Sequence, residues 1–217
     1  GLVGVQINLI KPINKGEQVW TASAFDLIVM GRVLNGKADF TRTITVAGSE
    51  IVAPAYAKVL PGTSISSVVA GKVKGAEYEQ RFIAGNVLTG QNVGKDGFVG
   101  FYDNTVTVIP DGGKTDEMFG WITPGLNRYS TSPSGLAGMF GLFKSKTWTL
   151  DARLKGGPRA LIVSGEWENV FPMDIYPEEL YKAVLTFNID KMEELGIYEV
   201  APEDLHSVSL LTHLRLL

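Results

Sequence analysis

Residues 42–48, with the sequence RTITVAG, alternate polar and apolar side chains and then break at a glycine. A period of two predicts a half-buried β-strand, which ends here at Gly48. Further downstream, the apolar patterns predict strands over residues 79–88, 98–102 and 105–109, the last of which alternates cleanly at Val106 and Val108.

A short helix is predicted between the first strands and the later ones. Residues 51–54 and 56–60 are expected to be extended, with Pro54 at an edge or strand start because proline donates no ladder hydrogen bond. A turn at residues 61–64 leads to a helix whose buried face consists of Ile65, Val68 and Val69. Strand, strand, short helix and further strands is the order of a compact β-grasp module.

Flanking segments complete an expected mixed α/β and α+β architecture. Residues 2–10 are apolar with partial alternation and predict a strand, and residues 18–20 predict a second, short one. Residues 24–34 predict a helix, with Asp26 in its first turn and Gly36 as its stop. Residues 1–40 are therefore expected to form the tail of an incomplete α/β layer.

The later part of the chain predicts a small mixed segment with helices. Short strands are expected over residues 148–150 and 160–163. Pro177, Glu178 and Glu179 suit the first turn of a helix, where proline needs no donor and acids face the positive end of the dipole. Asp190 and Glu193 resemble a capping box, with Gly196 as the matching stop.

Composition excludes several classes of function. The net charge of −3, with scattered Lys and Arg, argues against nucleic acid as a partner. The absence of Cys excludes disulfides, thiolate metal sites and Cys nucleophiles within these residues. His206 and His213 lie near the end of the chain, so no His-based metal site or triad is expected in its body, and no catalytic residue is assigned.

Glycines and acids invite three sharper hypotheses, each of which has a simpler alternative. Gly85, Gly90 and residues 94–97 lack the Lys-Ser/Thr pair of a P-loop, so a hairpin loop is expected rather than a phosphate site. Glu166, Glu168 and Asp174 could form a carboxylate pair, but surface or capping roles explain them better. Asp26 could grip a ligand, although a helix N-terminal acid explains it equally well.

The middle third resembles an SLBB-type (soluble-ligand-binding) β-grasp domain. This resemblance rests on residues 43–48, 52–54 and 60–63 and the short helix that follows them. Over its length up to Asp204, the chain resembles the family of A subunits of sodium-translocating NADH:quinone reductases. The residues that carry this second resemblance are 1–4, 10–13, 19–20, 26–31, 119–125, 165–175 and 195–200.

The resemblance to this family implies a function that composition alone does not. It implies a peripheral protein at the cytoplasmic face of the bacterial inner membrane, in a six-subunit complex that oxidises NADH, reduces ubiquinone and exports sodium. It places the flavins and the iron–sulfur centre in other subunits, associates the complete subunit with quinone, and leaves no cofactor for these residues. Membrane association would come through the partner subunits.

The expected domains follow from these two resemblances. They are an α/β tail (1–40), an SLBB-like β-grasp domain (41–115), a mixed segment with helices (116–204) and a tail that does not match the family (205–217). The family also implies segments before Gly1 and cysteine-containing sequence after Asp204, which residues 205–217 do not reproduce.

A partner-docking element is expected within residues 136–143, where glycines alternate with large apolar side chains. The docking residues would be Leu136, Met139, Phe140 and Phe143, with Lys144 and Lys146 just after them, although a buried core segment explains the pattern equally well. Phe119, Trp121 and Trp167 could contact quinone rings, but such aromatics are more often core residues.

Two other functions stay open at this point. One is a scaffold of the C-subunit type from the related ferredoxin:NAD electron-transport complex, whose C-x-x-C runs do not occur in this sequence. The other is a stand-alone β-grasp ligand-binding or polysaccharide-export module, which should carry an export signal and no matching flanks.

Overall fold

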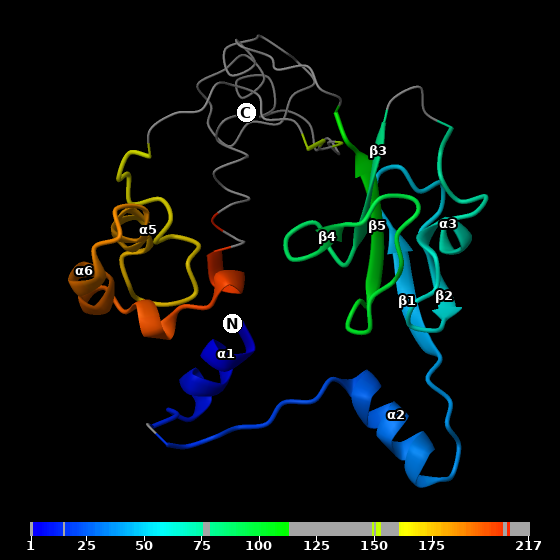
Figure 1. Ribbon diagram of the computed structural model, residues 1–217, viewed down its shortest axis with the longest axis horizontal. Helices are drawn as coiled ribbons and strands as arrows, with labels where there is room; N and C mark the ends of the chain where they lie inside the picture. Colours follow the sequence, from blue (N-terminus) through cyan, green and yellow to red (C-terminus); the bar gives the residue numbers. More distant parts are fainter. Residues whose placement is uncertain are drawn as a thin grey trace, which may run out of the picture. The chain divides into compact units, whose positions relative to one another are not determined.

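The structure is a computed structural model that describes residues 2–14, 16–75, 79–112, 149, 151–152, 161–205 and 208 (Figure 1). These residues divide into two compact units. The sheet unit comprises the described residues within 19–112 and 149–152, and the helical unit comprises those within 2–18 and 161–208. The predicted domain boundaries stay predictions.

The sheet unit is built on five strands in the order β2-β1-β5-β3-β4. β1 (Arg42–Ala47) pairs antiparallel with β2 (Ala55–Val59) and parallel with β5 (Thr105–Pro110). β3 (Gln80–Ala84) pairs antiparallel with β5, on the side of β5 away from β1. The short β4 (Gln91–Asn92) pairs antiparallel with β3 at the edge of the sheet. This parallel central pair inside an otherwise antiparallel sheet fits a β-grasp, so the predicted mixed α+β fold is confirmed.

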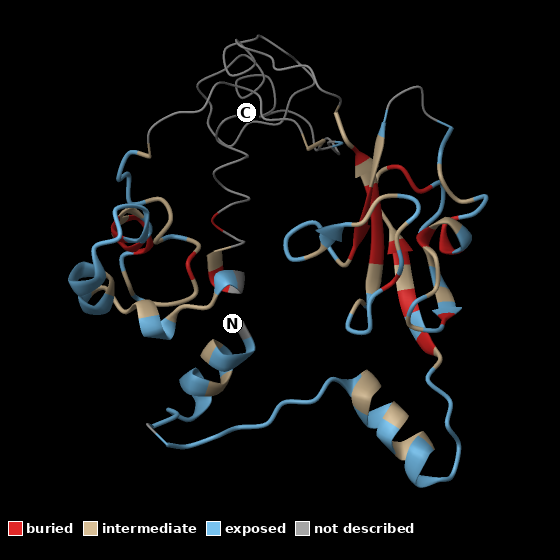
Figure 2. Ribbon diagram, viewed as in Figure 1, coloured by how far each residue is buried: buried red, intermediate tan, exposed pale blue. Residues whose placement is uncertain are grey.

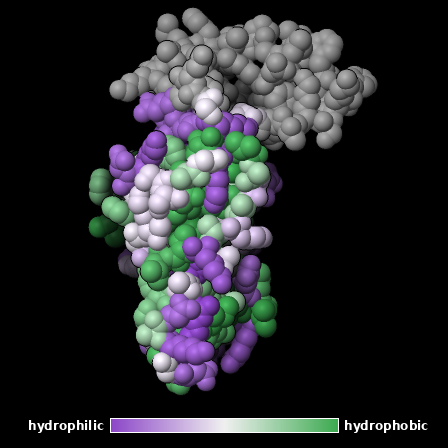
Figure 3. Space-filling model, turned by 90° about the vertical axis from the view of Figure 1, so that its right-hand side faces the viewer, coloured by the Kyte–Doolittle hydropathy of each residue, from purple (hydrophilic) through white to green (hydrophobic). Residues whose placement is uncertain are grey.

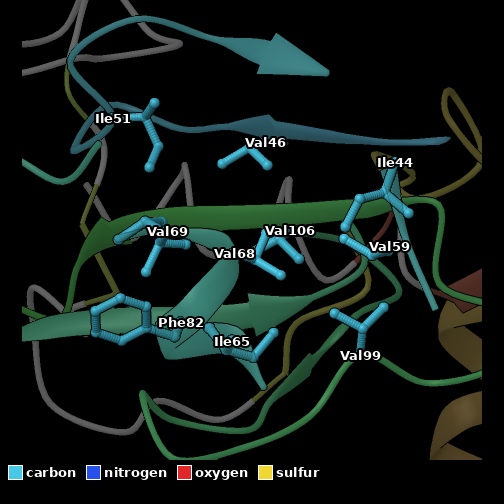
Figure 4. Close-up of a cluster of buried hydrophobic side chains, with 11 residues drawn as sticks. Ile44, Val46, Ile51, Val59, Ile65, Val68, Val69, Phe82, Val99 and Val106 are labelled. Atoms are coloured by element: carbon cyan, nitrogen blue, oxygen red, sulfur yellow. The ribbon is translucent and has the colours of Figure 1, made fainter. Parts of the chain in front are cut away.

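One face of the sheet packs on helix α3 (Ile65–Val68) and the residues around it, as Figure 4 shows. Ile44, Val46 and Val106 are fully buried because alternate residues of β1 and β5 point to this face. Burying one such side chain contributes about 1.5–3 kcal/mol, so this cluster supplies most of the unit's stabilisation. The cluster consists of Ile44, Val46, Ile51, Val59, Ile65, Val68, Val69, Phe82, Val99, Val106 and Val108.

Helix α2 (Ala24–Leu34) is confirmed with its predicted stop. Its last turn closes with amide hydrogen bonds from Gly36 to Val33 and from Lys37 to Arg32, the two bonds of a Schellman motif. Gly36 has a φ of +73°, which glycine adopts without the steric strain that a Cβ would add.

The predicted strand over residues 2–10 is wrong, because Leu2–Ile10 forms helix α1. Leu9 and Ile10 are among its exposed residues (Figure 2), and α1 pairs with no strand in the part of the chain that the structure describes. A helix satisfies its backbone groups internally, whereas a strand needs a partner. Residues 18–20 are likewise not a strand.

Three later strand predictions also differ from the structure. Phe98 makes only a single bridge to Ser64, and residues 101–102 form a turn, because the Gly100 amide donates to the Asp103 carboxylate and bends the chain. Residues 161–163 are irregular, and Ala160 lies outside the described residues. Thr149 is not in a strand, and its neighbours at 148 and 150 are not described.

The helical unit contains α5 (Pro177–Leu185) and α6 (Ile189–Glu194), followed by short 3-10 turns at Ile197–Glu199 and Pro202–Leu205. The predicted start of α5 at Pro177 is confirmed. The capping box predicted at Asp190 is wrong, because the N-cap is Asn188, whose side chain accepts from the Lys191 amide at 3.1 Å. Gly196 ends α6 as predicted, at a φ of +83°.

Candidate functional site

The predicted docking residues Leu136, Met139, Phe140 and Phe143 lie outside the described residues, as do Phe119 and Trp121. Their roles therefore stay predictions. The structure does describe other candidate residues, namely Arg42, Asp26, Glu178 and Trp167.

Arg42 is the buried cation of the sheet unit, with 3 % of its surface exposed. Its guanidinium carbon lies 4.4 Å from the centroid of the Phe25 ring of α2 and 5.9 Å from that of Phe101. Its Nη2 donates to the Asn104 side chain at 2.7 Å, whereas its Nε is buried without a hydrogen-bond partner. The two rings and the amide hold a charge that water no longer reaches, which fastens α2 to the sheet rather than presenting a cation to a ligand.

Asp26 takes the helix-capping role that its position in the sequence predicted. The Ser23 side chain accepts from the Asp26 amide at 3.1 Å, and the Asp26 carboxylate accepts from the Ser23 amide at 3.2 Å. Hydrogen bonds from the Ser23 hydroxyl first, and from its amide second, hold the pKa of the Asp26 carboxyl below its ordinary 3.8. This reciprocal pair satisfies two backbone donors at the start of α2.

Glu178, like Asp204, is a fully buried acid of the helical unit, with none of its surface exposed. Its carboxylate accepts from the Ser164 amide at 2.5 Å and from the Ser164 hydroxyl at 3.0 Å. It lies in the first turn of α5, where the helix dipole favours a negative charge. The carboxylate therefore fixes the chain before α5, which is a structural task. The predicted roles of Glu166, Glu168 and Asp174 at the surface or in caps stay predictions.

Trp167, one of the predicted quinone-contacting aromatics, lies beside Tyr181 of α5. The two ring centroids are 5.6 Å apart and the ring planes are tilted by 58°. Both side chains are partly exposed, so Trp167 packs on the surface of the helical unit and can report on binding there through its fluorescence.

A hollow of about 610 Å³ lies in the helical unit between α1 and the segment at residues 172–175. Its size falls within the range of small-molecule sites, and its walls are about as polar as they are apolar. The lining residues are Gly4, Val5, Asn8, Leu9, Ile13, Pro172, Met173, Asp174, Ile175 and Glu199.

Hydrophobic side chains also lie at the surface of α2, notably Leu27, Met30 and Leu34, which expose 58 %, 55 % and 88 % of their area. Figure 3 shows this side of the molecule, on which hydrophobic and hydrophilic residues are interleaved. The interleaving leaves individual apolar residues rather than one defined groove.

No group of three or more His, Asp or Glu side chains among the described residues could hold a metal ion. No helix in the described ranges is long and apolar enough to cross a membrane.

Sequence reasoning missed two residues that the structure singles out. Arg42 lies on the inward-facing side of β1, in phase with Ile44 and Val46. A charged residue at an inward-facing position of a strand indicates a buried charge that needs partners. Phe187 adopts a φ of +53°, the one positive φ outside glycine in the part of the chain that the structure describes. In the sequence, this conformation is indicated by the turn at residues 186–188, which joins two helices and contains no glycine.

The fold defines the class of protein as an SLBB-type β-grasp protein with helical flanks. Residues 43–95 match the family described as the NQRA C-terminal domain (SLBB), and residues 1–38 match the NqrA second alpha/beta domain. Two stretches of the chain thus match domain families of NqrA, in line with the resemblance that the sequence showed.

Curated relatives carry the name of the A subunit of the Na(+)-translocating NADH-quinone reductase. The chain is 32 % identical over 207 residues to the protein of Neisseria meningitidis serogroup B, and 33 % identical to those of Yersinia pestis biovar Antiqua and Klebsiella pneumoniae. Each alignment covers 94 % of this chain and 45 % of the relative. The chain thus spans about half the length of the relatives it matches.

Proposed function

We propose that this chain serves in a peripheral subunit of a membrane Na⁺-translocating NADH:ubiquinone oxidoreductase. It would lie at the cytoplasmic face of the bacterial inner membrane and be held there by the other subunits. The observation that carries this proposal is the pair of NqrA matches, over residues 1–38 and 43–95, in a chain whose similarity to the A subunits runs along 94 % of its length.

Within that complex, the role of these residues is binding and scaffolding in support of quinone reduction coupled to sodium export. Redox chemistry of this kind depends on cofactors, and the family resemblance places the flavins and the iron–sulfur centre in other subunits. Two of the buried ionisable groups support the same role, since Arg42 and Glu178 are both held by neighbours in structural contacts.

The hollow beside α1 is the place we propose for contact with quinone. Val5, Leu9 and Ile13 on its mixed walls can contact a quinone ring, and Asn8 offers a side-chain amide that can donate to a quinone carbonyl.

Purification of the tagged protein from detergent-solubilised membranes of its own host tests the assignment. Recovery of the other five reductase subunits is the expected result, and recovery of the protein alone would refute it. Titration of the chain with a short-chain ubiquinone, followed by Trp fluorescence, tests the quinone contact. We expect saturable quenching that Val5→Asp weakens, whereas linear quenching equal in both proteins would exclude a site in the hollow.

A further inference from the structure

The tip of the α5–α6 hairpin exposes an apolar knob, which consists of Val184, Leu185, Phe187 and Ile189. Their exposed fractions are 38 %, 60 %, 85 % and 67 %. Every residue from 184 to 190 is exposed, so the fold itself covers none of this tip. The knob is therefore a protruding surface whose largest side chain is Phe187.

The backbone at Phe187 is strained in a way that the fold does not need. The amides of Phe187 and Asn188 donate to the carbonyls of Val184 and Ala183, at 3.1 Å each, so α5 ends in a Schellman motif with Phe187 at its left-handed position. Glycine is the usual residue there, because a Cβ adds a steric penalty to left-handed backbone.

Two other helix ends among the described residues follow the usual pattern. The same motif at the end of α2 uses Gly36, at a φ of +73°, and the end of α6 uses Gly196, at a φ of +83°. A glycine would thus complete the α5–α6 turn with less strain than Phe187 does. Strain retained at an exposed residue suggests that the side chain has a use outside the fold.

The charge around the knob indicates what covers it. Residues 174–199 contain seven acids and two lysines, a net charge of −5, whereas the whole chain carries −3. Asp190, Glu193 and Glu194 are exposed on α6, all within about 9 Å along its axis from the knob. This rim repels a second copy of the chain and an anionic lipid surface, and it attracts a basic one.

We propose that the knob inserts into an apolar pocket, edged with Lys and Arg, on another protein subunit. This inference rests on the proposed function, because the partner would be a member of the same membrane complex. Phe187 fills the centre of the contact, where truncation of one aromatic side chain commonly weakens binding about thirtyfold or more. The acidic rim aligns the two surfaces and makes the association depend on salt.

The test uses the tagged protein in its host membranes with four variants. Phe187→Gly removes the ring and relieves the left-handed strain, so its thermal midpoint should rise by about 2–4 °C. Ile189→Ser tests the knob at unstrained backbone. Glu194→Lys reverses a rim charge at the C-terminal end of α6, where a cation suits the dipole. Tyr56→Thr, the control, removes an aromatic that is 78 % exposed on β2 of the sheet unit.

The proposal expects the other subunits to co-purify with the wild type and with Tyr56→Thr. It expects their recovery to fall about tenfold or more with Phe187→Gly and Ile189→Ser, and to fall with Glu194→Lys most strongly at low salt, where charges are least screened. Full recovery with Phe187→Gly would overturn the knob proposal and leave the proposed function standing. Failure of the wild type to recover any partner would overturn both.

Two further measurements test whether a membrane or a second copy of the chain covers the knob instead. If the wild type binds vesicles rich in phosphatidylglycerol and Phe187→Gly does not, a membrane covers the knob and the proposal is overturned. If the wild type self-associates in sedimentation and Phe187→Gly does not, a second copy covers it, with the same consequence.

Discussion

Replacing Gly48 with Ala should damage the sheet unit more than its small size suggests. Gly48 has a φ of +125°, and a Cβ built there would lie 2.0 Å from the carbonyl oxygen and 2.6 Å from the amide nitrogen of Val108. Those atoms belong to the backbone of β5, so no side-chain rotation relieves the overlap. The same Val108 carbonyl accepts from the Glu50 amide at 3.2 Å, which turns the chain back after β1.

The magnitude follows from three contributions. Positive φ costs an alanine about 1–2 kcal/mol, loss of the Glu50 hydrogen bond about 0.5–1.5, and displacement of β5 against a packed core about 1–3. The free energy of unfolding should therefore fall by about 3–6 kcal/mol, a large part of the roughly 5–15 kcal/mol that a domain has.

Gly62→Ala is the matched control, because Gly62 also has a positive φ, +85°, but an added Cβ would meet no atom within 4 Å. It should cost only the backbone contribution of about 1–2 kcal/mol. Urea unfolding followed by circular dichroism gives both values, and hydrogen exchange in β1 and β5 assigns the loss to the sheet. If Gly48→Ala loses no more stability than Gly62→Ala, the close approach to β5 does not limit this position.

The remaining predictions concern the buried and capping groups. Arg42→Lys should lower the free energy of unfolding of the sheet unit by about 1–2 kcal/mol, because an ammonium cannot stack flat on two rings; unchanged stability in urea would contradict the stacking. Glu178→Ala should cost the helical unit about 1–3 kcal/mol and speed hydrogen exchange at Ser164, whose amide loses its acceptor; exchange as slow as in the wild type would contradict the contact. The pKa of Asp26 lies below 3.8 in the folded chain, so its contribution to α2 is present above pH 3.8 and is lost as the pH falls through the folded value. An NMR titration should show this lowered pKa, and Ser23→Ala should move it back toward 3.8; a wild-type value at or above 3.8 would show that the cap does not form.

Elements with a strong local pattern could be predicted from sequence. β1 and β5 alternate along their length, and α2 carries its cap at Ser23 and its stop at Gly36 within its own residues. The short apolar run of α1 fits a strand or a helix equally well, and the partner that would decide between them is not a local property. Phe98 differs for the opposite reason, because nearby Gly100 and Asp103 turn the chain before a strand can continue.

The sequence by itself determined the resemblance to NqrA, the β-grasp order of elements, and the exclusion of cysteine chemistry, since these depend on residue identity and on patterns within a few turns of chain. Only the tertiary structure decided that Arg42 is buried between Phe25 and Phe101, that Glu178 holds Ser164, and that Phe187 projects from a strained turn. Burial and strain arise where segments distant in sequence meet or where a turn closes under the constraint of its neighbours. A pattern along the chain can point to such residues, as the inward phase of Arg42 does, but it does not supply their contacts.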